Sequence, residues 1–268
     1  MNIIGFIKNL NIFMKKNMIK SVKFKMKSEK LSIVILTKNS QKYLEKVLKS
    51  VEFADEVIIY DSGSSDKTLD IAKNFKNVKI FVDKNWEGFG KQKQKAVDRA
   101  SNKWVFVLDS DEVFTDNLKK EVLEILKNPI YDAYRVARLN NFFGKWIRHC
   151  GLFPDYSIRL FNREKCKFNE REVHESVECK RVGVLNNYFL HYAYENIEEF
   201  IDKQNRYSSL GAKPNKLKAI FSPYWTFLKI YFIKLGFLDG WAGFVIAKLY
   251  SEYTFWKYVK DKYENIGN

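Results

Sequence analysis

Short apolar runs alternate with amphipathic stretches over residues 31–130. The apolar runs are continuous and rich in Val, Ile and Leu, which predicts buried strands; they are residues 31–37, 56–61, 78–82 and 104–109. The stretches between them repeat apolar residues at helical spacing; they are residues 43–51, a stretch beginning near Asp66, and residues 89–101. This alternation predicts an α/β fold in which helices cover both faces of a mostly parallel sheet.

The second half of the chain has a different pattern. Shorter β-like pieces surround polar turns, at residues 134–137, 157–161 and 182–192, and residues 195–212 are predicted to be helical. We therefore expect three parts: a basic extension over residues 1–30, an α/β domain over residues 31–212, and a helical amphipathic segment over residues 213–268.

The predicted C-terminal segment is unusually aromatic. Fourteen aromatic residues lie between Phe221 and Tyr258, interleaved with lysines at positions 229, 234, 248 and 257. The longest charge-free apolar stretch, residues 240–247, is far shorter than the ~20 residues that a membrane-spanning helix needs. The segment is expected to lie on a membrane surface, to pack on the domain as a helical pair with aromatic core residues, or to do both in part.

Charge is concentrated at the two ends. Of the net +15, residues 1–30 contribute eight lysines and one glutamate, and residues 213–262 contribute nine lysines and three acidic residues. Nucleic-acid binders spread their basic residues over a groove or recognition helix, whereas basic flanks with aromatics fit an anionic membrane surface. We therefore expect an anionic membrane partner and no nucleic acid.

Two features bear on the cellular compartment. The N-terminus lacks an apolar run followed by a small-residue cleavage site, so no secretory signal is expected; residues 1–30 are predicted to be disordered, and Met26 is an alternative start. The three cysteines, Cys150, Cys166 and Cys179, are odd in number and form no C-x-x-C pair. This pattern predicts neither a disulfide framework nor a zinc site, and favours a reducing compartment.

Polar residues follow three of the predicted strands, in the segments 37–39, 61–64 and 109–111. Ligands of parallel sheets bind at the carboxyl ends of the strands. Asp109 and Asp111 could face one Mg²⁺ or Mn²⁺ together, or one of them could simply cap the helix near Asp116. Asp61 could accept from a base or a ribose hydroxyl, and Asn39 could cap the following helix.

Further candidates lie in the second half. Asp155 follows Pro154 and precedes a predicted strand, where a carboxylate suits a general base, although an ordinary turn aspartate would look the same. His174, Glu175 and His191 are polar residues near β-like pieces. A histidine in such a place is more often structural than a ligand, unless other ligands lie nearby.

Several of these segments together resemble glycosyltransferase family 2, and within it the lipopolysaccharide core-biosynthesis β-1,4-glucosyltransferases. The resemblance rests on residues 32–39, 54–68 and 107–112, and continues through residues 86–93, 144–149, 153–161, 173–175 and 237–244. It covers about residues 31–260, and its strength comes from the order of the motifs, since each one alone is weak.

The resemblance implies an inverting enzyme of GT-A (Rossmann-like) fold that uses a UDP-sugar and a divalent metal, Mg²⁺ or Mn²⁺. It places donor-binding residues at Thr37, Asn39, Asp61, Lys93 and Asp109. It places metal ligands at Asp109, Asp111 and His191, and the catalytic base at Asp155, with Glu175 as second choice. Two positions depart from the family: Pro154 replaces a glutamate, and Ser62 stands where many members have a second aspartate.

The resulting expectation is transfer of a sugar, glucose by resemblance, to a hydroxyl of a lipid-linked glycan such as an inner-core heptose of lipopolysaccharide. The enzyme would be cytoplasmic and peripheral on the inner face of a bacterial inner membrane. One alternative is a haloacid-dehalogenase-type phosphatase, since residues 107–113 fit its Asp-x-Asp-x-Val motif; that class needs downstream motifs that we do not find, and it carries the motif on the first strand. A second alternative is a non-catalytic membrane scaffold, which leaves the polar strand ends unexplained.

Overall fold

The structure is a computed structural model that describes residues 28–169 and 176–260. Its strands are β1 (Leu31–Thr37), β2 (Glu56–Asp61), β3 (Val78–Val82), β4 (Trp104–Asp109), β5 (Glu112–Val113), β6 (Ala133–Phe142), β7 (Lys145–Ile147), β8 (Asp155–Asn162), β9 (Lys167–Phe168), β10 (Val177–Glu178) and β11 (Val182–Tyr194). Its α-helices are α2 (Gln41–Ser50), α3 (Thr68–Lys73), α4 (Phe89–Asp98), α5 (Asp116–Ile125), α6 (Ile197–Leu210), α7 (Lys216–Leu228) and α8 (Trp241–Val259).

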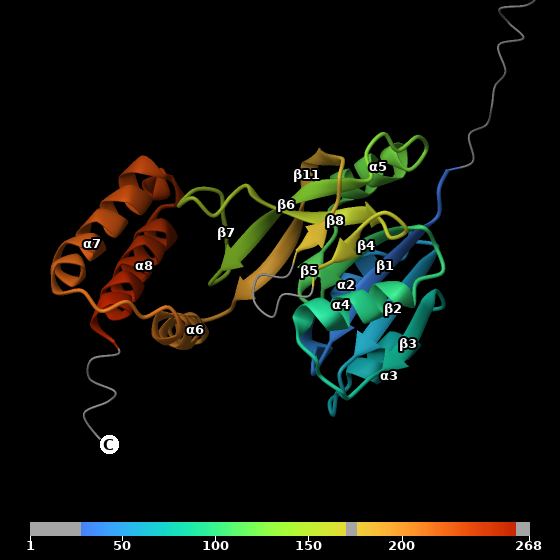
Figure 1. Cartoon of the computed structure of the whole chain (residues 1–268), viewed down its shortest axis with the longest axis horizontal. Coiled ribbons are helices and arrows are strands. Elements are labelled where there is room, and N and C mark those ends of the chain that lie inside the picture. The colour runs from blue at the N-terminus through green and yellow to red at the C-terminus, as the bar shows by residue number, and fades with distance from the viewer. Residues whose placement is uncertain (1–27, 170–175, 261–268) are drawn as a thin grey trace, which may run out of the picture.

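Within the described residues, nine strands form one sheet in the order β3-β2-β1-β4-β8-β6-β11-β5, with β7 beside β6 (Figure 1). The first four strands are parallel, and β8 joins β4 in the antiparallel direction. Because β8 runs against β4, the start of β8 lies at the edge where β1, β2 and β4 end. The protein thus has the predicted α/β fold, with its polar strand ends gathered on one edge of the sheet.

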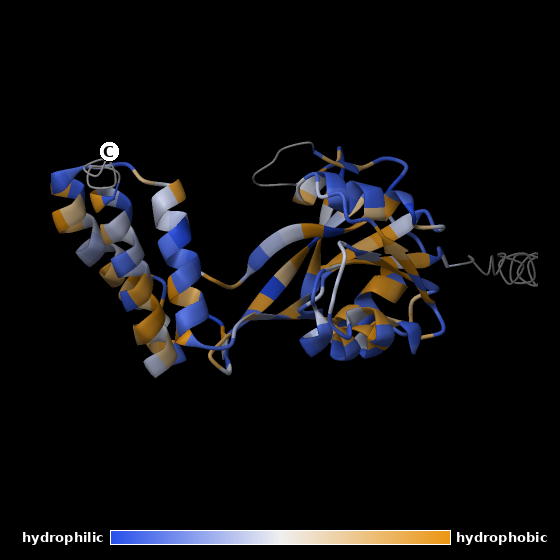
Figure 2. Ribbon diagram, turned by 90° about the horizontal axis from the view of Figure 1, so that it is seen from below, coloured by the Kyte–Doolittle hydropathy of each residue, from blue (hydrophilic) through white to orange (hydrophobic). Residues whose placement is uncertain are grey.

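Helices cover both faces of the parallel strands. One face buries Ile33, Ile35 and Ile59 against α2, α3 and α5, and the other buries Val34 and Ile58 against α4. Since successive side chains of a strand point to opposite faces, both faces can be apolar only if the runs are continuous, as the sequence shows. The ribbon coloured by hydropathy shows this apolar sheet between helices that are polar outside (Figure 2).

The last helices form a layer beyond the end of the sheet (Figures 1 and 2). Helices α7 and α8 pack side by side and are joined by a π-helical turn, Lys229–Ile233, and a 3₁₀ turn, Gly236–Asp239. The approach is close at Gly243, where an added Cβ would lie 1.8 Å from the carbonyl oxygen of Gly236. Phe200 of α6 packs against Phe142 and Tyr250, so α6 bridges the sheet and α8.

A buried aspartate ties this helical layer to the α/β half. Asp239 accepts hydrogen bonds from the backbone nitrogens of Arg148 and His149, at 3.3 and 2.9 Å. The His149 ring nitrogen Nδ1 lies 3.1 Å from the same carboxylate. The segment after β7 is therefore held directly to the turn that precedes α8.

The predicted elements are confirmed, and the strands at 31–37, 56–61, 78–82 and 104–109 have the expected bounds. The capping alternatives are wrong. Thr115, and not Asp109 or Asp111, caps α5 by accepting from the nitrogen of Leu118, and Ser40 rather than Asn39 precedes α2. Across the described parts of the chain, no helix is both long and apolar enough to cross a bilayer.

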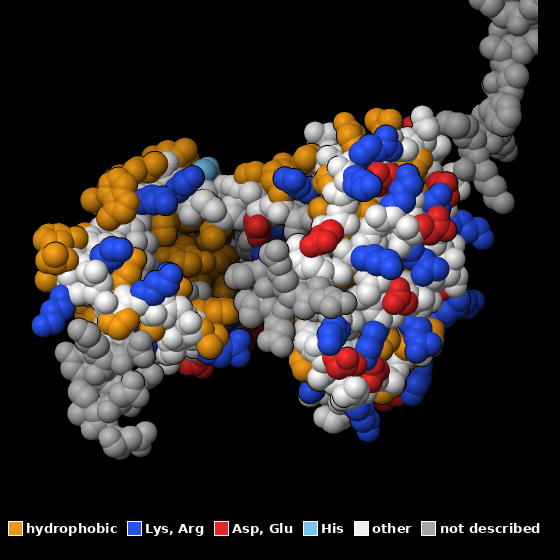
Figure 3. Space-filling model, in the orientation of Figure 1, with side chains coloured by type: hydrophobic (Ala, Val, Ile, Leu, Met, Phe, Trp, Pro, Cys, Tyr) orange, Lys and Arg blue, Asp and Glu red, His pale blue; other side chains and the backbone are white. Residues whose placement is uncertain are grey.

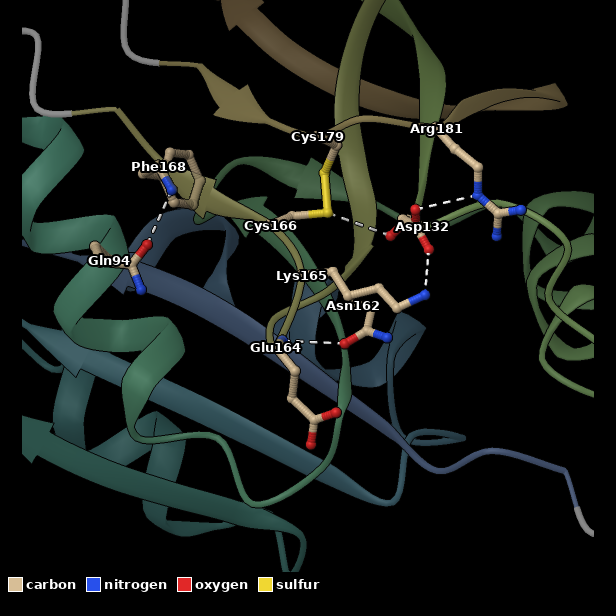
Figure 4. The surroundings of a disulfide bond; sticks show 9 residues. All are labelled: Gln94, Asp132, Asn162, Glu164, Lys165, Cys166, Phe168, Cys179 and Arg181. Carbon is tan, nitrogen blue, oxygen red and sulfur yellow. Dashed lines mark hydrogen bonds and ion pairs between the residues drawn. A yellow bond between two sulfur atoms is a disulfide. The ribbon is translucent and has the colours of Figure 1, made fainter.

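The expectation that the cysteines form no disulfide is wrong. Cys166 and Cys179 are bonded, and they close the short hairpin of β9 and β10 (Figure 4). Asp132 stands beside this bond and pairs with Lys165 and Arg181. Cys166 and Cys179 lie 13 residues apart and form no C-x-x-C motif, so the sequence alone does not indicate the bond. The pairing of β9 with β10 brings the two sulfurs together. Cys150 is free and buried.

Candidate active site

The turn between β4 and β5 places Asp111 beside His191. Strand β5 pairs with β11 so that Glu112 lies opposite His191, and the nitrogen of Tyr192 donates to the carbonyl oxygen of Asp111. As a result, His191 Nε2 lies 3.5 Å from Asp111 Oδ2. These residues are 80 positions apart in the sequence, so the β5–β11 pairing alone brings this predicted pair together.

The neighbour of His191 determines which ring nitrogen carries a proton. His191 Nδ1 lies 2.7 Å from Asn140 Oδ1, and an amide oxygen can only accept. Nδ1 therefore carries the hydrogen, and in the neutral ring the lone pair is on Nε2, the atom that faces Asp111. A ligating imidazole is usually oriented by such a hydrogen bond on its other nitrogen.

Asp109 faces cations instead. Its carboxylate lies 3.3 Å from Lys93 Nζ, which comes from α4, and 3.5 Å from the guanidinium of Arg159 on β8. Burial by itself would raise the pKa of Asp109, but the charges of Lys93 and Arg159 outweigh it and hold the pKa well below its usual range. Asp109 is therefore ionised at neutral pH. Asp109 and Lys93, both predicted to bind the donor, are in direct contact.

Glu112 and Arg159 complete this end of the sheet, and the sequence did not single them out as site residues. Glu112 is fully buried; it accepts from the nitrogen of Asp109 at 2.8 Å and from Arg159 at 2.7 Å. Burial raises the pKa of Glu112, and the charge of Asp109 adds to this effect against the opposing charge of Arg159. The arrangement fixes the Asp109 backbone and holds one guanidinium between two carboxylates.

The tips of β1 and β2 form a second polar cluster. The buried carboxylate of Asp61 accepts from Thr37 Oγ1, from Ser64 Oγ, and from the backbone nitrogens of Gly63 and Ser64. Gly63 has a φ of +88°, which favours glycine in this turn. Asp61 therefore shapes the tip, with its four acceptor positions filled by the protein.

Asn39 connects the two tips and remains exposed. Its Oδ1 accepts from the nitrogen of Ser65 at 2.9 Å, and its own nitrogen donates to Ser64 Oγ at 2.8 Å. Its backbone is left-handed, with φ +51°, which asparagine tolerates better than most residues. The exposed polar groups of this tip thus belong to Asn39 and its serine neighbours.

Asp155 lies at the start of β8, in a pocket of about 410 Å³ that also includes Asp109 and Lys93. Arg138, opposite it on β6, donates to Asp155 Oδ2 from Nε at 3.1 Å and from Nη2 at 2.6 Å. Within the described residues, the other oxygen, Oδ1, accepts no hydrogen bond. The carboxylate is thus held by one oxygen while the other is available.

Glu175 and His174 fall outside the described residues. In the parts of the chain that the structure covers, no group of three or more His, Cys, Asp or Glu side chains is arranged to hold a metal ion. The Asp111–His191 pair offers two such side chains, and the third predicted ligand, Asp109, contacts Lys93 and Arg159.

Comparison with known proteins points to a single family. Residues 32–178 match Glycosyl transferase family 2. The chain is 30% identical over 240 residues to the lipopolysaccharide core biosynthesis glycosyltransferase LpsC of Rhizobium meliloti, covering 84% of this chain and 89% of that protein. It is 29% identical over 259 residues to an uncharacterized glycosyltransferase of Rickettsia bellii, covering 87% of this chain and 86% of that protein.

Solved structures with similar folds include TarS of S. aureus in complex with UDP-GlcNAc, at 18% identity and a TM-score of 0.48, covering 81% of this chain and 79% of that one. Another is the mannosyltransferase PcManGT from Pyrobaculum calidifontis in complex with GDP-Man and Mn²⁺, at 12% identity and a TM-score of 0.49, covering 75% and 68%. The family match spans more than half of the chain and includes the β1, β2 and β4 tips. The chain belongs to glycosyltransferase family 2 and is a glycosyltransferase.

Proposed function

We propose that the enzyme moves a sugar from a UDP-sugar to a hydroxyl of a lipid-linked glycan, with inversion and with the help of a divalent metal. Glucose is the proposed donor sugar, and an inner-core heptose of lipopolysaccharide the proposed acceptor, by likeness to LpsC and to the glucosyltransferases that the motifs resemble. The observation that carries the proposal is the approach of Asp111 to His191 beside Asp109, at the edge that also contains Asp155.

The residues at this edge fit a hard divalent cation. Asp111 supplies a carboxylate and His191 an Nε2 lone pair that Asn140 keeps in place. Mg²⁺ and Mn²⁺ need few protein ligands, because water and diphosphate oxygens fill the other positions. A metal bound there supplies Lewis-acid stabilisation of the departing diphosphate, worth several kcal/mol. Lys93 and Arg159, held next to Asp109, would add positive charge at the same place.

Asp155 is the proposed base. Its Oδ1 takes the proton of the acceptor hydroxyl as that oxygen forms a bond to the anomeric carbon. The bond from the anomeric carbon to the diphosphate breaks, and its electron pair leaves with UDP. Arg138 positions the carboxylate through Oδ2 without occupying Oδ1, and general-base help of this kind contributes roughly 10²–10⁴-fold.

A peripheral location on an anionic membrane surface is part of the proposal. Its support is the apolar surface of the helical layer, where Phe221, Tyr224 and Trp225 of α7 are exposed. Figure 3 shows hydrophobic side chains gathered over this end of the molecule, and mixed charges over the α/β half. Exposed apolar side chains with nearby lysines favour the headgroup region of a bilayer, where a lipid-linked acceptor would be presented.

The test is to incubate the pure enzyme with UDP-glucose, UDP-galactose and UDP-GlcNAc, with Mn²⁺, with Mg²⁺, or with a chelator, and to measure the release of UDP. We expect metal-dependent release, fastest with UDP-glucose. Release of UDP that is indifferent to metal would remove the metal from the proposal, and no release from any of the three UDP-sugars would remove the donor class. Family membership already excludes the haloacid-dehalogenase phosphatase alternative.

A further inference from the structure

The pocket that contains Asp155 is rich in positive charge. Its lining includes the cations Lys93, Arg135, Arg138 and Arg159, against the carboxylates Asp109 and Asp155. Three of these cations contact the two carboxylates: Lys93 and Arg159 contact Asp109, and Arg138 contacts Asp155. Arg159 also contacts the buried Glu112 at 2.7 Å, so three carboxylates face these three cations. Arg135 is the fourth cation, and it contacts no carboxylate among the described residues.

Arg135 comes from the middle of β6, between Ile158 of β8 and Val184 of β11. Its side chain is exposed, and within the described residues its guanidinium makes no hydrogen bond, ion pair or ring contact. A guanidinium without a partner at the wall of a pocket can bind a planar or tetrahedral anion through two parallel N–H groups.

We infer that Arg135 binds an anionic substituent, a phosphate or a carboxylate, on the acceptor glycan. The inference rests on the proposed function, since it assigns the chemistry of the acceptor in the same pocket. An anion at Arg135 would place the acceptor against the β8–β6 side of the pocket, next to Asp155 and its available oxygen.

The order of the strands separates this position from the donor. Thr37 and Asp61, which are predicted to bind the nucleotide, end β1 and β2, and Asp109, beside the proposed metal position, ends β4. Strand β8 stands between β4 and β6, so Arg135 is on the opposite side of β4 from the nucleotide residues. Lys93 and Arg159, which contact Asp109 at the end of β4, are the cations proposed to face the diphosphate. An anion at Arg135 therefore belongs to the second substrate.

The experiment uses the full chain saturated with UDP and Mn²⁺, so that the diphosphate position is filled. A hexose 6-phosphate and the same hexose without phosphate are then titrated calorimetrically. We expect the wild type to prefer the phosphorylated sugar, and Arg135→Gln to weaken its binding about tenfold. Arg135→Lys should lose less, and UDP affinity should not change in either variant.

Arg206→Gln is the matched control, because it removes the same charge from the exposed surface of α6. Equal binding of the two sugars by the wild type would overturn the inference and leave the proposed function standing. A loss of UDP affinity in Arg135→Gln would also overturn the inference, because Arg135 would then bind the donor diphosphate. If the wild type does not bind UDP at all, the proposed function fails instead.

Discussion

The α/β half and the helix pair α7–α8 use their apolar residues in opposite ways. In the first, the strands β1, β2 and β4 place nearly all of theirs in the core, on both faces of the sheet. In the second, α7 buries only Ala219 of its 13 residues, while Phe221, Tyr224 and Trp225 are 67, 72 and 59% exposed. Both regions are comparably apolar in sequence, so apolar content alone does not reveal which region forms a core.

The difference points to the α/β half for the candidate chemistry and to the helix pair for the proposed membrane contact. Where the apolar residues are buried, polar residues gather at the strand ends, and they form the candidate active site. Where the apolar residues are outside, they form a patch of the kind that marks contact with a membrane or another protein. The buried Asp239 joins the two regions, and substitutions away from this contact can alter one region while the contact itself stays in place.

The largest effect is expected from Asp111→Ala in the α/β half. Without this carboxylate the metal position next to His191 is lost, and we expect transfer to fall by more than about 10³-fold. The melting temperature and vesicle binding should stay near those of the wild type, because Asp111 is partly exposed and lies outside the helix pair. Asp70→Ala, an exposed aspartate of α3, is the control. Full activity of Asp111→Ala at low Mn²⁺ would contradict the metal site.

Asp155→Asn tests the base in the same half. The amide keeps the shape of the side chain but cannot take a proton, so turnover should fall roughly 10²–10⁴-fold. UDP-sugar binding, measured by titration, should be retained, because Asp155 is proposed to act on the acceptor. Glu175→Gln is the comparison variant: if it loses turnover in this way while Asp155→Asn does not, Glu175 is the base.

Glu56→Gln tests whether the two regions unfold together. Glu56 is buried and accepts from Ser32, Lys79 and Ser101. Burial opposes ionisation, but these hydrogen bonds prevail and lower the pKa of Glu56 from 4.5 to about 2. The variant should lose about 2–3 kcal/mol of unfolding free energy at pH 7. If the variant unfolds in a single transition, the stability of the helix pair depends on the α/β half.

The pH dependence gives a second measurement for this variant. A carboxylate with a lowered folded-state pKa stabilises the protein above the unfolded-state pKa, and this contribution is lost as the pH falls toward the folded-state value. The stability difference between wild type and Glu56→Gln should therefore shrink from about pH 4.5 down to about pH 2. Glu45→Gln, which breaks only an exposed pair with Lys49, should leave stability almost unchanged. A difference that stays constant with pH would contradict the assignment.

The smallest effect is expected in the helix region, from Lys229→Gln combined with Lys234→Gln. Each lysine near an anionic surface contributes roughly 1 kcal/mol, so the double variant should bind anionic vesicles about 30-fold more weakly, and the binding should be sensitive to salt. Lys76→Gln with Lys120→Gln makes the same charge change on the α/β half and should leave binding unchanged. If the wild type does not bind such vesicles, the exposed aromatic residues of α7 are better explained as a contact with another protein.

The position of much of the candidate site could be predicted, because its residues stand at the ends of continuous apolar strands. The alternation of apolar runs and amphipathic stretches over residues 31–130 predicts that Thr37, Asp61 and Asp109 lie together, since parallel strands bring their carboxyl ends to one edge of the sheet. Glu112 and Arg159 were not predicted to belong to the site, because an acidic or basic residue within a strand-like segment has no local signal. Their importance comes from burial next to Asp109, which only the packed sheet shows.

The sequence by itself determined the α/β class, the bounds of the first four strands and the family, because apolar periodicity and strand-end motifs are local properties of the chain. The tertiary structure decided the rest through contacts between distant segments. The β5–β11 pairing brings His191 to Asp111, the β9–β10 hairpin joins Cys166 to Cys179, and the β6–β8 pairing places Arg138 on Asp155. Whether an aromatic residue is core or surface also depends on what packs over it, and the outward face of α7 is seen only when the helices are in place.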